Sequence, residues 1–262
     1  MKKFVAIIKM AVIESLSYRG DIFLFVVSGI IAPLLMLAVW LTVSTSGGTP
    51  PMSVPQIINY FVLIMFVEVV NSAWSSPYVA RDIRLGKLST YLVKPFNYMV
   101  WFAGQNLGEK CLKLIYLIPL LSLLTVLFQK NIDGFVVTNV MFFIPALILA
   151  VIITFIFDFI IGVSAFWIQD VKPLRDLQDV CYFVLSGKII PLIALPAILH
   201  DVNELLPFRY MLSFPVEIII NSLTFSEMIF GFLTQLFWLS TLLTVYIIMW
   251  HKGLKKYSAV GA

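Results

Sequence analysis

Charged residues are scarce in this sequence. They make up 12% of its 262 residues, whereas soluble domains carry about 25%. Hydrophobic residues reach 61%, and the mean hydropathy is +0.99. This composition excludes a soluble globular domain. It also argues against nucleic acid as a partner, because proteins bind phosphate backbones through many clustered lysine and arginine side chains.

Cysteine and histidine are also rare, with two residues each. Cys111 and Cys181 lie at the edges of apolar runs, so a disulfide framework is excluded and hydrophobic packing is their expected role. Walker A, nucleophile-elbow, HExxH and CxxC patterns are absent from the sequence. We therefore expect a chain that is not an enzyme, without catalytic, cofactor-binding or metal-binding residues. His200, Asp201 and Glu204 are the one polar cluster to weigh, and a solvated patch is the simpler interpretation.

Six apolar runs are long enough to cross a bilayer, which takes about 20 helical residues. They predict an all-α integral membrane protein in which residues 1–262 form a single transmembrane domain. Lys113, near the start of the third run, is expected to reach the membrane interface. Residues 2–18 mix bases with apolar side chains, which predicts a helix along the membrane surface, with a charged leader as the alternative. The expected spans are 22–43, 57–79, 111–128, 135–168, 180–199 and 228–250.

The distribution of lysine and arginine predicts the orientation, because basic residues near span ends are retained in the cytoplasm. With the N-terminus inside, only Lys130, Lys188 and Arg209 of the 18 basic residues fall on the outer side. An odd number of spans would spoil this partition. Both termini are therefore expected in the cytoplasm.

Ionisable residues inside spans usually face a cavity or a partner, because burying a charge in hydrocarbon is costly. Glu68, with Asn59 and Asn71 in the same span, predicts a polar stripe along a pathway or a subunit interface. Interhelical hydrogen bonding that fixes packing is the alternative for Glu68. For Asp158 we expect a structural ion pair or an interface contact. Glu217 is the third such acid.

The region from the fifth span to the sixth is rich in helix-breaking residues. Gly187, Pro191 and Pro196 predict a bend or break, and broken backbone at membrane depth must be covered by protein or face water. Two short apolar pieces follow, each interrupted by proline. We expect two re-entrant or interfacial half-helices on the outer side, marked by Pro207, Phe208, Pro215 and Glu217.

The loop between the second and third spans alternates apolar residues with bases at near-helical spacing. Ile83, Leu85, Leu88 and Leu92 supply the apolar positions. This pattern is typical of a short amphipathic helix that presents its bases to a soluble partner. An anchor on anionic lipid is the alternative.

These residues resemble the permease subunits of type-two (ABC-2) ABC exporters, in the six-span bacterial group with a separate ATPase. The likeness covers nearly the whole chain. Ser89 departs from it, because relatives commonly carry an acid there. The motifs are Ile83-x-x-Gly86-x-Leu88-x-x-x-Leu92-x-x-Pro95, Ser186-Gly187-x-Ile189-Ile190-Pro191-Leu192 with Leu195-Pro196, and Leu206-Pro207-Phe208 with Pro215.

The resemblance implies a non-catalytic transport subunit that forms half of a pathway in the bacterial cytoplasmic (inner) membrane. Its implied partners are two ABC ATPase subunits, which would bind ATP and Mg²⁺, membrane lipids, and a second permease chain, homologous or identical. The cargo would be hydrophobic or amphiphilic. An ion-coupled secondary transporter that uses Glu68 or Asp158 is the alternative, and a lipid-modifying enzyme ranks below it. The implied ATPase-coupling residues are Ile83, Arg84, Gly86, Leu88, Leu92 and Pro95.

Overall fold

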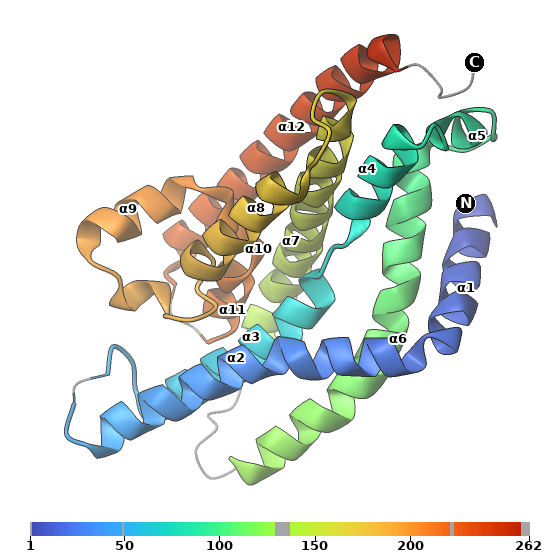
Figure 1. The fold of residues 1–262 in the computed structure, drawn as a ribbon. Helices are drawn as coiled ribbons and strands as arrows, with labels where there is room; N and C mark the ends of the chain where they lie inside the picture. Colours follow the sequence, from blue (N-terminus) through green and yellow to red (C-terminus); the bar gives the residue numbers. More distant parts are fainter. Residues whose placement is uncertain (1, 49, 129–136, 221–222, 258–262) are drawn as a thin grey trace.

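The computed structural model describes residues 2–48, 50–128, 137–220 and 223–257, apart from the side chains of residues 137, 138, 197 and 199. Every regular element in these ranges is a helix, which confirms the all-α class (Figure 1). Lys130 and residues 135–136 of the expected fourth span lie outside the described residues.

Five helical segments in the described part of the chain are long and apolar enough to cross a membrane. Each exceeds about 18 residues, and at about 1.5 Å per residue the longer ones exceed the roughly 30 Å of hydrocarbon. They correspond to all the expected spans except 180–199. The segments are α2 (Arg19–Thr45), α3 (Val54–Asn71) continued by α4 (Ser75–Arg84), α6 (Tyr98–Leu127), α7 (Val137–Val163) and α12 (Phe225–Lys256).

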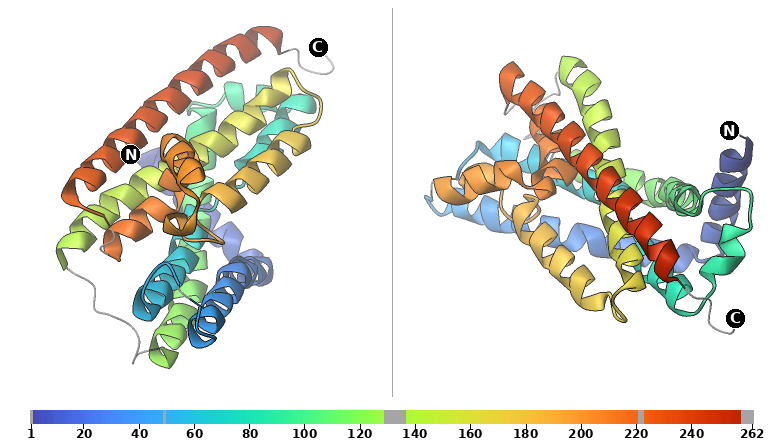
Figure 2. Two further views of the ribbon diagram at one scale, coloured as in Figure 1. Left: turned by 90° about the vertical axis from the view of Figure 1, so that its left-hand side faces the viewer. Right: turned by 90° about the horizontal axis from the view of Figure 1, so that it is seen from above.

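The structure corrects the continuous span expected over 180–199. Helix α8 (Lys172–Leu185) ends at the start of this range, and Gly187 then adopts a φ of +86°. The hydroxyl of Tyr60 donates a hydrogen bond to the Gly187 carbonyl at 2.7 Å, which fixes the turn to α3. Because prolines follow the turn, the chain continues only as a short 3₁₀ segment, η2 (Leu192–Ala194), and α9 (Ala197–Leu205). Figure 2 shows α9 outside the layer formed by α7, α8 and α12.

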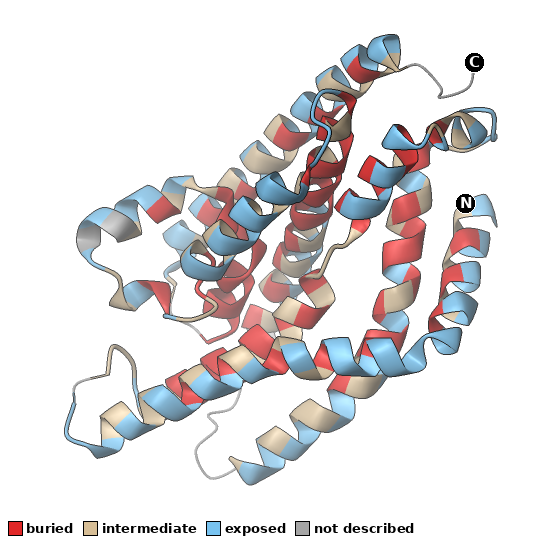
Figure 3. Cartoon of the chain, viewed as in Figure 1, coloured by how far each residue is buried: buried red, intermediate tan, exposed pale blue. Residues whose placement is uncertain are grey.

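Two short helices occupy the places where the sequence predicts half-helices. They are α10 (Pro207–Met211) and α11 (Ser213–Ile219), and every side chain in both is buried (Figure 3). They pack against α7, α3 and α12. Gly231 of α12 makes room for them, because a Cβ at this position would lie 2.0 Å from the Phe214 ring.

Helix α1 (Lys2–Ser17) packs alongside the N-terminal half of α6 (Figure 1). Two glycines of α6, one turn apart, permit the close approach: a Cβ on Gly104 would lie 2.6 Å from Ile7 Cγ2, and one on Gly108 2.4 Å from Ala11 Cβ. Small residues at this spacing let helix backbones approach closely. The sequence predicts the helix, whereas its attachment to α6 depends on these two glycines.

We expect Gly108→Val to separate α1 from α6 and to lower the stability of the chain by about 1–3 kcal/mol, because the added methyl groups have no space. Thermal unfolding of the purified chain in mild detergent measures the change. Gly20→Val is the matched control, since a Cβ at Gly20 meets no atom within 4 Å. Equal losses in the two variants would contradict the packing role.

Candidate functional site

The second span is broken inside the membrane. Helix α3 ends at Asn71 and α4 begins at Ser75, and the proline at position 77 explains the break, because its ring is incompatible with a helical carbonyl four residues earlier. Both helix ends leave backbone groups without partners inside their helix. In a bilayer such groups must be satisfied by protein or by water. Here, side chains of α6 and α7 bind these backbone groups.

Asp158 of α7 binds the first turn of α4. Its Oδ2 accepts hydrogen bonds from Ser75 Oγ at 2.6 Å and from the backbone N–H of Ser76 at 2.9 Å. One turn further along α7, Gly162 permits the contact, because a Cβ there would lie 2.9 Å from the Ser76 carbonyl oxygen. A carboxylate at a helix N-terminus is stabilised by the free N–H groups and by the helix dipole. Asp158 therefore contacts another span of the same chain as a helix cap, and an ion pair or a contact across an interface stays a prediction.

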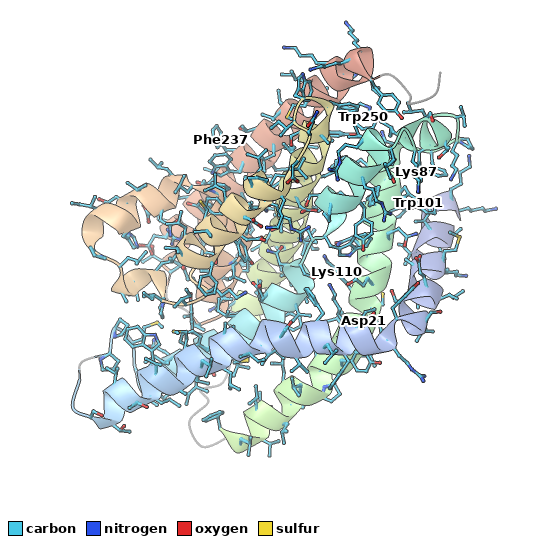
Figure 4. All side chains as sticks on the ribbon, in the orientation of Figure 1. Asp21, Lys87, Trp101, Lys110, Phe237 and Trp250 are labelled. Atoms are coloured by element: carbon cyan, nitrogen blue, oxygen red, sulfur yellow. The ribbon has the colours of Figure 1, made fainter. Side chains whose placement is uncertain are left out.

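Lysines of α6 bind the other side of the break. The carbonyl of Ser72 accepts hydrogen bonds from Lys110 Nζ at 2.8 Å and from Asn106 Nδ2 at 3.3 Å (Lys110 is labelled in Figure 4). Lys113 Nζ donates to Ser72 Oγ at 2.9 Å and pairs with Glu109 at 2.7 Å. Lys113 is 1% exposed, which corrects the expectation that it reaches the interface. The break thus has a cation at its carbonyl end and an anion at its amide end.

A cavity of about 290 Å³ lies beside the break. Three of the four predicted pathway residues, Glu68, Asn71 and Asp158, line it, whereas Asn59 is buried elsewhere on α3. Glu68 accepts hydrogen bonds from Lys188 Nζ at 2.7 Å and from the Tyr182 hydroxyl at 2.8 Å. Glu68 therefore connects helices and also borders the cavity. Its contacts are compatible both with a packing role and with a pathway role. The remaining lining residues are Phe25, Ser72, Ala73, Thr154, Arg175, Gln178, Asp179, Tyr182, Phe183 and Lys188.

The outer residues form a separate group. Arg209 Nη2 lies 2.8 Å from Glu217 Oε2, and Arg209 Nη1 lies 2.9 Å from Glu204 Oε1. These three side chains line a second cavity of about 150 Å³ together with His200 and Pro191. The buried arginine explains how an acid such as Glu217 is tolerated there.

The other outer residues predicted from sequence shape the backbone around this ion pair. Pro196 precedes α9, and Pro207 is the first residue of α10. Phe208 and Pro215 are buried, and the Phe208 ring lies 6.0 Å from that of Phe157. His200 lies 3.8 Å from Asp201, whereas Glu204 pairs with Arg209.

The loop after α4 makes a tight turn with an exposed apolar tip. Gly86 has a φ of +71°, and the five-residue helix α5 (Leu88–Leu92) follows. Ile83 and Leu88 are buried, so they attach the loop to the spans. The tip, which we define as Leu85, Leu92, Val93 and Pro95, is exposed, and Val93 reaches 84%. The bases Arg84, Lys87 and Lys94 surround it on the same exposed loop.

Aromatic and polar contacts fix the loop to α6 and α12. The backbone N–H of Ser89 donates to the Tyr257 hydroxyl at 3.2 Å, and the Tyr98 hydroxyl donates to Asp82 at 2.9 Å. Burial, together with the carboxylate of Asp82, raises the pKa of Tyr91. Trp250 of α12 stacks on Tyr98, with ring centroids 5.7 Å apart (Figure 4). The loop is therefore connected to α4, α6 and α12.

The comparisons with known proteins decide the family. The family model described as ABC-2 family transporter protein matches residues 52–261. The chain belongs to the ABC-2 family. It is the multi-pass membrane permease subunit of an ABC transporter, and ABC-2 permeases work with an ABC ATPase subunit. A search of curated proteins and a search of solved structures give no significant match.

Sequence reasoning missed the contacts that close the break in this ABC-2 permease. The proline at position 77, inside the expected span 57–79, is the signal that predicts a break. Lys110 and Lys113 were interpreted from their position near a span end, although an adjacent free helix end also accounts for buried lysines. Tyr182 and Arg175 carry no signal in the sequence, because only the fold brings α8 beside α3 and α4.

We expect Asp158→Ala to lower stability by about 1–3 kcal/mol, because the free N–H groups of α4 would lose their acceptor in a buried site. Asp158→Asn should lose less, since an amide oxygen still accepts hydrogen bonds. Unfolding of the purified chain in detergent measures both. Asp176→Asn is the control, because its ion pair with Lys172 is exposed and should change stability by less than about 0.5 kcal/mol. Comparable losses at both aspartates would contradict the capping role.

Proposed function

We propose that this permease forms half of the translocation pathway of an ATP-driven exporter for hydrophobic or amphiphilic cargo. Two ATPase subunits bind ATP and Mg²⁺ on the cytoplasmic side, and a second permease, homologous or identical, supplies the other half. The complex lies in the bacterial cytoplasmic membrane, and both termini of this chain are inside. The direction of the helices supports this: α7 and α12 run the same way, so α8 to α11 return the chain between them and the number of crossings stays even (Figure 2). The observation that carries the proposal is the exposed apolar tip of the α4–α5 loop, fixed to the spans by buried residues.

The loop has the features of a docking element. An exposed apolar tip surrounded by bases suits a partner groove with an apolar floor and an acidic rim. Buried Ile83 and Leu88 prevent the tip from moving independently of α4. Binding of ATP to the partner would then favour one arrangement of the spans over another, because the loop and the spans move together.

The charges support an amphiphilic cargo. The outer faces of α2 and α12 carry large exposed apolar side chains, which suit lipid and apolar molecules. The charged groups inside the bundle are paired with one another or with helix ends. A highly charged polymer would need an unpaired stripe of opposite charge, which the described residues do not offer.

The alternative, an ion-coupled transporter, would require Glu68 or Asp158 to bind and release protons. Asp158 instead holds the first turn of α4, and Glu68 is paired with Lys188. Both carboxylates have structural partners, so the ATP-driven mechanism is the simpler proposal. Glu68, Asp158 and Asp179 all line the cavity, and Glu68 is the intramembrane acid among them that pairs with a lysine.

Purification of the tagged chain from its host in mild detergent should recover an ATPase subunit that carries Walker motifs, and a second permease chain. Mass spectrometry identifies the proteins, and the complex should hydrolyse ATP. In vesicles, transport should require ATP. A chain that purifies alone and transports cargo without nucleotide would overturn the proposal in favour of ion coupling.

Aspartate at the exposed tip should prevent docking without unfolding the chain. We expect Leu85→Asp combined with Val93→Asp to lower ATPase recovery about tenfold or more, because the charges would enter an apolar contact. Immunoblots of the co-purified ATPase and of the membrane fraction measure docking and folding. Val202→Asp, on exposed α9, is the control and should leave recovery unchanged. Unchanged recovery in the double variant would remove the docking assignment.

Glu68→Gln separates a pathway role from a packing role. The substitution keeps the side-chain size but removes the charge that pairs with Lys188. We expect folded protein at the normal level and a changed KM for transport, measured in ATP-loaded vesicles. Glu14→Gln on exposed α1 is the control. A variant that only assembles poorly, with an unchanged KM, would make Glu68 a packing residue.

A further inference from the structure

The cavity beside the break contains polar atoms without partners. Asn71 and Thr154 are buried, with 1% and 7% of their surface exposed. Within the described residues, neither Asn71 Oδ1 nor Thr154 Oγ1 makes a hydrogen bond. Leaving such an atom unsatisfied costs about 1–3 kcal/mol. Both side chains line the cavity, so a polar group placed in it would recover this energy.

Thr154 differs from three other threonines of the long spans. A hydroxyl in a helix commonly bonds a carbonyl one turn earlier in the same helix. Thr42, Thr234 and Thr244 all do so, at 2.8–2.9 Å. Thr154 does not, and it lies one turn before Asp158 on the face of α7 that borders the cavity. Its hydroxyl is thus available to a ligand.

The cavity wall also presents one cation and one anion in weak mutual contact. Arg175 and Asp179 lie one turn apart on α8, with Arg175 Nε 3.9 Å from Asp179 Oδ2. Their side chains are 31% and 67% exposed, unlike the Glu68–Lys188 pair, whose side chains are 17% and 15% exposed. A surface ion pair of this length contributes little energy. Arg175 also donates from Nη1 to Ser76 Oγ at 3.3 Å. Each partner of the ion pair can exchange this weak contact for a ligand group of opposite charge.

Apolar rings complete the cavity. Phe25 of α2 and Phe183 of α8 both line it and are 45% and 43% exposed. These half-exposed rings can cover an alkyl chain, whereas the inner wall is polar. The site thus combines polar acceptors and donors with an apolar rim. Its charged residues are the pair Glu68–Lys188, the cap Asp158, and the more exposed Arg175 and Asp179.

We propose that this cavity binds the zwitterionic head group of an amphiphile, with its alkyl chain on Phe25 and Phe183. The anionic group of the ligand pairs with Arg175 and its cationic group with Asp179. Asn71 Oδ1 lies against the cationic group of the ligand, and the Thr154 hydroxyl donates to an oxygen of its anionic group. That this amphiphile is the cargo rests on the proposed export function, whereas its binding needs neither ATP nor the ATPase.

Photolabelling of the full chain tests the site directly. The chain is placed in phosphatidylglycerol nanodiscs, which hold no zwitterionic lipid, and is exposed to diazirine probes with the same dodecyl chain. One probe carries phosphocholine, one trimethylammonium and one phosphate. We expect the phosphocholine probe to label peptides from residues 64–75 and 172–188 at least fivefold more than either singly charged probe.

Two substitutions test the proposed contacts. Thr154→Val removes a hydroxyl that has no partner, so the fold should persist, and labelling by the phosphocholine probe should fall about fivefold, as expected for one hydrogen bond. Thr244→Val is the matched control and should label normally. Arg175→Gln should abolish the preference for phosphocholine over trimethylammonium.

Competition identifies the source of the ligand. Displacement of the probe by dodecylphosphocholine but not by glycerophosphocholine supports a membrane amphiphile, as proposed. Displacement by both compounds at equal concentration would overturn the role of the alkyl chain and would indicate that the site binds a soluble zwitterion. Equal labelling by all three probes, or labelling unaffected by Thr154→Val, would overturn the site. Because the ATPase is absent from this experiment, these failures are distinct from a failure of the export proposal.

Discussion

The break in the second span is the constraint on which the arrangement of the other helices depends. A helix interrupted in hydrocarbon must find partners for its free amide and carbonyl groups, because no water is there to bind them. Asp158 of α7 and Lys110 of α6 supply charges of the sign that each helix end attracts. The contacts fix α6 and α7 on either side of the break, and the cavity forms where α8 completes this wall.

The break also divides the second span into two parts with different neighbours. The outer part, α3, packs on α2, α6, α7 and α11, whereas α4 packs mainly on α7. The coupling loop is continuous with α4, so a force on it acts first on α7 and, through Tyr257 and Trp250, on α12. The polar cavity lies at the boundary between these two groups of helices.

Local signals in the sequence predicted much of this structure. Long apolar runs gave the five crossing helices, and the prolines at 207 and 215 gave the two buried short helices. The prediction of a continuous fifth span was wrong, because hydropathy measures only how apolar the residues are and does not detect the left-handed turn at Gly187. Glu68, Asn71 and Asp158 were found as intramembrane polar residues. Their partners were not, because Tyr182, Lys188 and Lys110 are brought to them only by tertiary packing.

The contact between α1 and α6 has a consequence for biosynthesis. Ile7 and Ala11 emerge from the ribosome roughly a hundred residues before Gly104 and Gly108, which at about 5–20 residues per second is an interval of about 5–20 seconds. During this interval α1 has no partner helix and must remain at the membrane surface, where its apolar and basic residues suit it. The surface helix that the sequence predicts thus corresponds to the nascent chain, and the docked helix to the finished one.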